Sequence, residues 1–165
     1  MQAKNLTELL AHEIQDLYSA EDQILEALPD MIENARDADL QAVLREHYDQ
    51  TRHHKSRLET VAEELEVKLD GSKCKGMVGI IKEGSDLIRK QDDEDVRDAA
   101  IIASAQRVEH YEMAAYGTAA HFATALGLSR VAQQLNQTLQ EEKVTDKTLS
   151  RIADGRVNER AIEAR

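Results

Sequence analysis

The sequence predicts an all-α protein, an antiparallel four-helix bundle whose long crossover connection contains a short fifth helix. The 165 residues include one proline and seven glycines, and residues that favour helices dominate. Apolar residues recur three and four positions apart along most of the chain, and no alternating run of β-branched residues indicates a strand. This length suits a single domain, residues 1–165, with a largely aliphatic core because aromatic residues make up only 3%.

The charge and the apolar content of the sequence argue against some classes of binding partner. The formal net charge is −11, and the basic residues are scattered, whereas nucleic-acid binding needs a clustered positive surface. No apolar stretch reaches the roughly 18 residues of a membrane helix, and the N-terminus lacks a secretory apolar segment. We therefore expect a cytoplasmic protein with no nucleic-acid or membrane partner. Cys74 is the only cysteine, so its thiol is either buried and inert or exposed and redox-sensitive.

The first helix is expected to begin after Asn5, because Asn5-Leu-Thr-Glu8 fits a capping box. Its apolar stripe consists of Leu10, Ile14, Leu17, Ile24, Leu28 and Met31 or Ile32. Glu21 interrupts this stripe near its middle. Pro29 removes one backbone hydrogen bond and should kink the helix near its end. Asp37 or Asp39 then suits the N-cap of the next helix.

The second helix should run from about Leu40 to Val67. Its stripe consists of Leu40, Val43 or Leu44, His47, Thr51, His54, Leu58, Val61 or Ala62, and Leu65. The ends of this stripe are apolar, and its polar interruption again falls in the middle of the helix.

The stretch from Gly71 to Asp95 is too long for a tight hairpin between two helices. Within it, Met77–Ile88 has the apolar spacing of a short amphipathic helix. We interpret the stretch as a crossover connection. Two hairpins joined by such a crossover form a bundle of the ferritin-like kind.

The third long helix should begin after Asp95 as N-cap and run to about Ala125, with Gly127 at its C′ position. Its stripe consists of Ile102, Gln106, Glu109, Met113, Tyr116, Ala120 and Ala123. Glu109 lies at the centre of this mostly apolar face. A buried carboxylate is costly unless it is paired, hydrogen-bonded or bound to a metal.

The fourth long helix should begin near Ser129 and end at Gly155, followed by one more short helix within residues 156–165. Its stripe consists of Val131 or Ala132, Leu135, Leu139, Glu142, Thr145 or Asp146, Leu149 and Ile152. Glu142 is the acidic residue at the middle of this stripe, as Glu21 and Glu109 are in theirs.

The two predicted hairpins bring these polar residues to similar depths. With the first turn near residue 36, Glu21 lies level with residue 51, and His47 is about one turn away. With the second turn near residue 127, Glu112 lies level with Glu142, and Glu109 with Asp146. The candidate metal ligands are therefore Glu21, His47, Gln50, His54, Glu109, Glu112, Glu142 and Asp146.

Two interpretations of this layer remain open. Carboxylates and imidazoles facing inward from four helices build di-iron and di-manganese centres, and iron, manganese and zinc all accept such ligands. Alternatively, the same residues could form a buried polar network with the nearby tyrosines, provided that every member is satisfied.

Three stretches resemble the YciE/YciF family of bacterial stress proteins: Asp16–Pro29, Ala105–Gly117 and Thr138–Asp146. His47 with Thr51 and the crossover from Cys74 to Ile80 also match, so the resemblance covers nearly the whole chain. It implies a ferritin-like bundle, often dimeric, that is related to rubrerythrin-type di-iron proteins and linked to general stress responses. We therefore expect a homodimer that binds iron in a di-iron or single-metal site, with manganese or zinc as alternatives.

The di-iron pattern of the superfamily has one Glu on each of two helices and a Glu-x-x-His motif on each of the other two. Carried over, Glu21 and Glu109 take the single-Glu places. Neither Glu-x-x-His motif is present: the second helix offers Gln50, Thr51 and His54, and the fourth offers Glu142 followed by Thr145 and Asp146. The expected function is a metal-binding stress protein that handles iron or peroxide. The alternative is a non-catalytic dimeric bundle that acts through protein–protein interaction and keeps a vestigial polar network.

Overall fold

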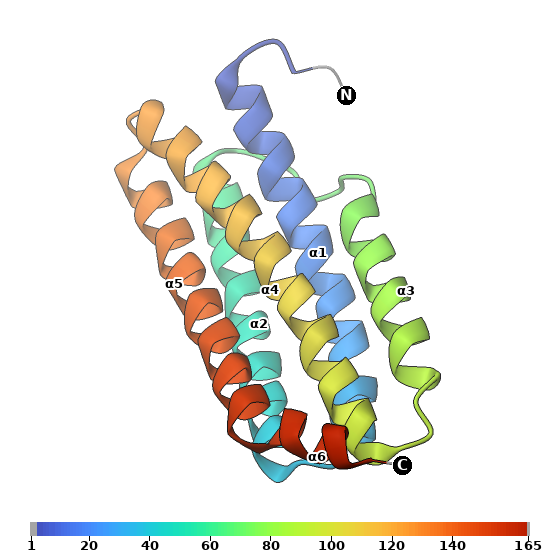
Figure 1. The fold of residues 1–165 in the computed structure, drawn as a ribbon. Coiled ribbons are helices and arrows are strands. Elements are labelled where there is room, and N and C mark those ends of the chain that lie inside the picture. The colour runs from blue at the N-terminus through green and yellow to red at the C-terminus, as the bar shows by residue number, and fades with distance from the viewer. Residues whose placement is uncertain (1–2, 165) are drawn as a thin grey trace.

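The structure is a computed structural model that describes residues 3–164, and all the regular secondary structure in that range is helical (Figure 1). The elements are α1 (Leu6–Asn34), α2 (Ala38–Glu64), α3 (Lys75–Arg89), α4 (Glu94–Ala125), α5 (Ser129–Ile152), a π-helical turn η1 (Ala153–Val157) and α6 (Asn158–Glu163). The predicted all-α class and the number of long helices are confirmed.

The four long helices form the ferritin-like bundle from two hairpins. Helices α1 and α2 pack as one hairpin and α4 and α5 as the other, while α1 lies against α4 and α2 against α5. Helix α3 runs outside the bundle, where it packs mainly on α4 and less on α1 (Figure 1). The long connection is therefore a crossover, as predicted.

The first two helices begin where the sequence indicates. The Asn5 side chain accepts a hydrogen bond from the Glu8 amide, and the Asp37 side chain accepts from the amides of Asp39 and Leu40. Pro29 lies inside α1, and the helix continues past it to Asn34. Gly127, with φ +76°, occupies the left-handed position that ends α4.

The N-cap predicted for α4 is wrong by two residues. Asp93, not Asp95, accepts hydrogen bonds from the first amides of the helix. The Asp95 carboxylate instead pairs with Arg36 and Arg160. Several acidic residues follow one another here, so the sequence pattern alone does not select the capping one.

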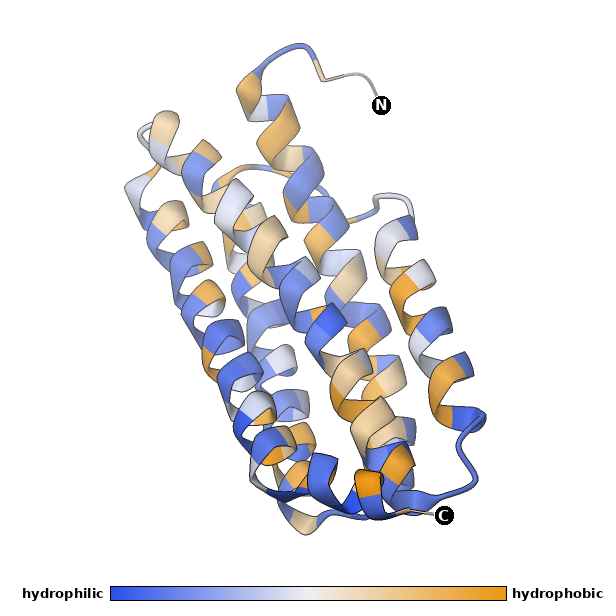
Figure 2. Cartoon of the chain, in the orientation of Figure 1, coloured by the Kyte–Doolittle hydropathy of each residue, from blue (hydrophilic) through white to orange (hydrophobic). Residues whose placement is uncertain are grey.

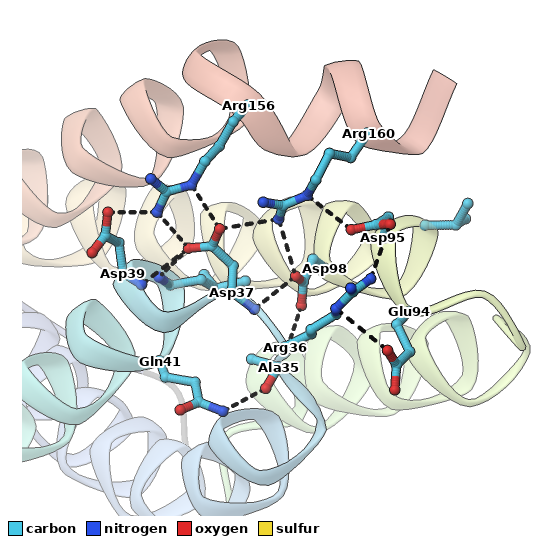
Figure 3. A network of polar contacts seen from close by, with 12 residues as sticks. Ala35, Arg36, Asp37, Asp39, Gln41, Glu94, Asp95, Asp98, Arg156 and Arg160 are labelled. Atoms are coloured by element: carbon cyan, nitrogen blue, oxygen red, sulfur yellow. Dashed lines mark hydrogen bonds and ion pairs between the residues drawn. The ribbon is translucent and has the colours of Figure 1, made fainter. Parts of the chain in front are cut away.

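The end predicted for the last long helix is also wrong. Gly155 lies within η1, and the helical path continues through it into α6, which crosses one end of the bundle (Figure 1). Arg156 and Arg160 hold this segment to Asp37 in the α1–α2 turn (Figure 3). These contacts and the buried Val157 outweigh the low helix propensity of glycine. The short final helix is confirmed to Glu163, and residue 165 lies outside the described residues.

The bundle core consists of two apolar clusters with a polar layer between them. One cluster, around Leu28, Leu44 and Ile101, lies toward the α1–α2 turn. The other, around Leu10 and Leu135, lies toward the α4–α5 turn. Hydrophobic and hydrophilic residues alternate along the helices, as amphipathic helices require (Figure 2). Cys74, at the start of α3, is buried, in line with the first of its two predicted environments.

None of the helices described between residues 3 and 164 combines the length and the apolar character that crossing a membrane requires.

Candidate metal centre

Six ionisable side chains from four helices converge in the polar layer. Each is at most 3% exposed, although groups of this kind are rarely buried without partners. They are Glu21 from α1, His47 and His54 from α2, Glu109 and Glu112 from α4, and Glu142 from α5. His47 and His54 lie two turns apart, and Glu109 and Glu112 three residues apart, so each pair shares one face of its helix. We call these six residues the Glu/His cluster.

The cluster divides into two groups that share one residue. His47, Glu109, Glu112 and Glu142 each offer a ligand atom, and these atoms lie within 4.8 Å of one another. Glu21, His54 and Glu142 form the second group by the same measure. Ligand atoms about 2.0–2.2 Å from one cation are separated by distances of this order. Because Glu142 belongs to both groups, its two oxygens suit a bridge between neighbouring cations.

The imidazoles of His47 and His54 face carboxylates of the cluster without forming regular hydrogen bonds to them. His47 Nε2 lies 3.3 Å from Glu109 Oε1, and His47 Nδ1 lies 3.8 Å from Glu142 Oε2. His54 Nδ1 lies 2.8 Å from Glu142 Oε1, but the contact is not aligned as a hydrogen bond. These donor atoms lie close together, as the ligands of one bound cation would.

The other nitrogen of His54 is held from outside the cluster. His54 Nε2 lies 2.8 Å from Glu141 Oε2, and Arg57 binds both oxygens of Glu141 at 3.0 and 3.3 Å. Arg57 also donates to the hydroxyl of Thr138. A metal-binding histidine commonly donates its second N–H to a carboxylate, which fixes the tautomer and orients the ring. Glu141 fills that role, leaving Nδ1 of His54 as the ligand atom.

Tyr116 completes the surroundings of Glu21. The Tyr116 side chain is fully buried, and its hydroxyl donates a hydrogen bond to Glu21 Oε1. Glu21 Oε2 has no such partner. One oxygen of Glu21 is therefore fixed by Tyr116, and the other remains available to a cation.

Unpaired polar atoms test whether the cluster suits a metal. Among the described residues, nine buried side-chain nitrogen and oxygen atoms lack a hydrogen-bond partner, and all nine belong to the Glu/His cluster. A buried polar group without a partner costs about 1–3 kcal/mol, and a charged one more. Four ionised glutamates carry a charge of −4, which two divalent cations would neutralise. With all four glutamates ionised, the residues present therefore fit a two-cation centre, whereas a closed polar network would need protons shared between the carboxyl groups.

Burial raises the pKa of three of the glutamates. It raises the pKa of Glu21 to about 7, against the lowering effect of His54. Burial, followed by the negative charge of Glu142, raises the pKa of Glu109 and of Glu112 well above the usual range. In the absence of a cation these three carboxyl groups hold protons near neutral pH, and binding of a metal has to displace them.

Glu142 and His54 behave as an ion pair. Burial opposes ionisation of Glu142, but contact with His54 outweighs it and lowers the Glu142 pKa to about 2. Burial likewise opposes protonation of His54, and the contact with Glu142 outweighs it and raises the His54 pKa. Burial lowers the pKa of His47, so this imidazole is neutral and its lone pair is available to a metal.

The cluster keeps the donor set of a bundle di-iron site with a different distribution over the helices. The standard arrangement has four glutamates and two histidines, and the Glu/His cluster has the same numbers. Thr51 occupies the place of the glutamate three residues before His54, and α4 supplies two glutamates, Glu109 and Glu112. Thr145 occupies the place of the histidine three residues after Glu142, and α2 supplies the second histidine, His47. The departures seen in the sequence thus compensate one another in space.

Two of the predicted ligands lie beside the cluster. Asp146 accepts a hydrogen bond from Gln106 and pairs with His110, so it belongs to neither group. The Gln50 amide oxygen accepts from Thr145, and its nitrogen donates to Glu46. Both side chains are only half-buried, because each is rotated one residue away from the inward face.

Sequence reasoning missed Glu141. This residue precedes an inward-facing ligand and therefore points partly outward, and its partner His54 is 87 residues away in the chain. The one available signal was Arg57, which shares a helix face with His54 and needs an acidic partner.

Comparison with known proteins agrees with this architecture. A family described as a domain of unknown function, DUF892, matches residues 5–162. Protein YciF of Escherichia coli strain K12 is 38% identical over 162 residues, which cover 98% of each chain.

Solved structures show the same fold. The crystal structure of the E. coli stress protein YciF matches 94% of this chain and 99% of its own, with a TM-score of 0.90 and 38% identity. The Rhodopseudomonas palustris protein YcfI matches 89% of this chain and 94% of its own, with a TM-score of 0.87 and 40% identity. A Xanthomonas campestris protein with 18% identity and a TM-score of 0.74 shares the fold, with 92% of each chain covered. The chain therefore belongs to the DUF892 family and, within it, to the YciF-like stress proteins with a ferritin-like helical bundle.

Proposed function

We propose that this protein binds two divalent metal ions in the Glu/His cluster and uses them in the handling of iron or peroxide during stress. The observation that carries the proposal is the set of nine buried, unpaired polar atoms, all of which come from the cluster. Buried polar atoms without a partner destabilise a protein interior. A pair of cations would satisfy them and neutralise the four glutamates together.

Iron is the metal that we propose. Carboxylate oxygens and imidazole nitrogens suit iron, manganese and zinc, and carboxylate-rich bundle sites hold iron or manganese. Two iron ions would supply one electron each, which is the number needed to reduce one peroxide to the level of water or alcohol. Membership of the YciF-like stress proteins supports a protective role of this kind.

The residues of the chain have distinct roles in this proposal. Glu142 would be a ligand shared by the two cations, because it is common to both groups. Glu21 and His54 would complete one site, and His47, Glu109 and Glu112 would complete the other. Glu141 orients His54, and Tyr116 orients Glu21 through its hydroxyl. The apolar clusters on both sides of the layer separate the centre from the two ends of the bundle.

Anaerobic loading with Fe(II), followed by desalting and elemental analysis, tests the proposal. We expect about two irons per chain, and about two manganese ions when Mn(II) is used instead. The loaded protein should also melt at a higher temperature than protein treated with chelator, because the metal binds only the native state.

The matched control replaces half-buried Asp146 by Asn. Asp146 lies beside the cluster but in neither group, so this variant should keep the full metal content. Substoichiometric metal in the loaded wild-type protein, with no change in melting temperature, would contradict the proposal. That result would favour the vestigial polar network of a non-catalytic bundle.

A further inference from the structure

A cavity of about 630 Å³ lies between α1, α3 and α4 and extends inward to His47 and Glu109. Its outer wall is formed by α3, the crossover helix that packs on the outside of the bundle (Figure 1). Its inner end therefore borders the group of His47, Glu109, Glu112 and Glu142. The cavity shares His47 and Glu109 with the cluster, and its other lining residues lie outside the cluster.

The lining is aliphatic along most of the cavity. Ile24 and Leu28 from α1, Ile80, Ile81 and Ile88 from α3, and Val108 from α4 provide much of its surface. Within residues 3–164, no Phe, Tyr or Trp side chain contributes to it. Small-molecule sites typically have volumes of about 300–1,000 Å³ and apolar walls with a few polar groups. A flexible aliphatic chain suits such walls better than a planar ring, which would stack on aromatic side chains.

The polar lining residues that are open to an occupant are charged side chains at the rim and His47 and Glu109 at the inner end, because the buried Gln23 and Ser104 donate to backbone carbonyl groups. The rim carries exposed side chains of both positive and negative charge, including Lys82, Asp86 and Arg89. These opposite charges give the rim no preference for a cationic or an anionic head group. At the inner end, both nitrogens of His47 and Glu109 Oε2 have no hydrogen-bond partner. An occupant with one polar end therefore finds its polar partners at the inner end, which are these atoms in chelated protein and the cation that they would hold in loaded protein.

We propose that this cavity binds an unbranched aliphatic molecule whose uncharged, oxygen-bearing end (an alcohol, aldehyde or hydroperoxide) lies against His47 and Glu109. The orientation of this end rests on the proposed metal centre, whereas binding of the aliphatic chain depends only on the walls. An uncharged end fits better than a carboxylate, because a carboxylate would be desolvated beside Glu109 and its neighbouring glutamates. The metal centre would thus act on aliphatic substrates, and α3 would form one wall of the substrate site.

The first experiment titrates the chelator-treated chain, residues 1–165, with decan-1-ol and follows the isoleucine methyl groups by NMR. Saturable shifts are expected at Ile24, Ile80 and Ile88, which line the cavity, and not at Ile14, which lies in the other apolar cluster. Decanoate should bind about tenfold more weakly or worse because of its charge. The absence of saturable shifts at the three lining residues would overturn the proposal.

Alanine-to-leucine substitutions that reduce the cavity volume test the assignment, and the same substitution outside the cavity is the matched control. Ala105→Leu, at a lining position on α4, should weaken decanol binding about tenfold, the effect of excluding about two methylene groups. Ala114→Leu makes the same change at an exposed position of the same helix and should leave the affinity unchanged. Ala27→Leu, at a half-buried lining position on α1, gives the same readout if Ala105→Leu fails to fold. Unchanged affinity in a folded lining variant would contradict the assignment.

The orientation is tested on Mn(II)-loaded protein by paramagnetic relaxation of bound decanol. The protons next to the hydroxyl should relax faster than the terminal methyl group, because the polar end lies nearest the metal. The opposite gradient would overturn the orientation. Failure of the protein to take up Mn(II) would contradict both the proposed metal centre and this orientation. The titration of the chelated protein tests binding of the aliphatic chain independently of the metal.

Discussion

Glu142 is the residue on which the metal centre depends most. It is fully buried, contacts both imidazoles and is common to the two groups of potential ligands. The ion pair with His54 keeps it ionised, whereas burial favours protons on the other three glutamates. Glu142 is therefore already ionised and can bind a cation without first losing a proton.

Conservative substitutions should separate the two groups by stoichiometry. Glu142→Gln should remove both metals, because a neutral amide replaces the shared carboxylate. Glu21→Gln affects one group and should leave about one metal per chain. Elemental analysis after anaerobic Fe(II) loading measures both variants, with Asp146→Asn as the control. Equal metal loss in Glu142→Gln and Glu21→Gln would argue against the bridging role of Glu142.

Glu141 acts on the metal through His54. Glu141→Gln should lower metal affinity about 10–100-fold, the usual effect of losing the carboxylate that orients a metal-binding histidine. The metal stoichiometry at saturation should not change, because no ligand is lost. Competition with a chelator of known affinity measures the effect, and Glu83→Gln, at an exposed position of α3, is the control. An affinity equal to that of the control would show that Glu141 does not position His54.

At the scale of the elements, the α1–α2 turn is held by a carboxylate from another helix. Asp98 on α4 is fully buried and accepts hydrogen bonds from the backbone amides of Arg36 and Asp37 at 2.8 and 2.9 Å (Figure 3). Arg156 and Arg160 bind Asp37 from the other side. The turn, the beginning of α4 and the C-terminal segment are thus fixed to one another.

Removal of the Asp98 carboxylate should destabilise this end of the bundle. Asp98→Ala leaves two backbone amides without their acceptor and should lower the free energy of unfolding by about 1–3 kcal/mol. Asp92→Ala, at an exposed position just before α4, should change it by less than about 0.5 kcal/mol. Urea unfolding of chelator-treated proteins measures both. A loss no greater than that of the control would refute the structural role of Asp98.

Helix boundaries show how far the sequence determines the elements. Asn5, Asp37 and Gly127 act as predicted because capping depends on local backbone geometry. Asp93 and Gly155 differ from prediction because contacts distant in the chain decide them. Asp95 forms ion pairs with Arg36 and Arg160, and Asp37 binds Arg156 in the segment around Gly155.

The candidate site was predictable to the extent that it follows from helix periodicity. Mid-stripe polar residues and hairpin register identified all six members of the Glu/His cluster, although His47 was expected about one turn from the level of Glu21. Gln50 and Asp146 were included because hairpin register predicts the depth of a residue along the bundle well. It predicts poorly which face of the helix the residue lies on. Glu141 and the cavity behind α3 depend on side-chain orientation and on packing of the crossover, which periodicity does not encode.

At the scale of the whole molecule, the buried glutamates should make stability depend on pH and metal together. Glu21 holds its proton up to a pKa of about 7, against 4.5 in the unfolded chain, so the native protein binds more protons across that interval. The free energy of unfolding of metal-free protein should therefore fall as pH rises from 4.5 to about 7. Glu109, Glu112 and His54, with raised pKa values, act in the same direction, and His47 opposes them.

Bound metal should reverse this dependence, because it replaces the protons and binds more tightly as pH rises. Urea unfolding of chelated and Mn(II)-loaded protein across this interval measures the difference. The effect of Asp37, whose lowered pKa affects stability only as pH falls below about 3.8, lies outside the interval. Parallel pH curves for the two forms would contradict proton displacement by a metal.

The homodimer stays a prediction. Size-exclusion chromatography with light scattering should give about twice the chain mass of 18.5 kDa, because the resemblance implies a dimeric bundle. A single species of 18.5 kDa at micromolar concentration would show that the protein is a monomer.

Anomalous diffraction at the iron absorption edge, from crystals of anaerobically Fe(II)-loaded protein, tests the two-iron centre without relying on stoichiometry. Two anomalous peaks are expected in the polar layer, one between Glu21 and His54 and one between His47 and Glu109, with Glu142 between them. Clear density for the six side chains without an anomalous peak among them would contradict it.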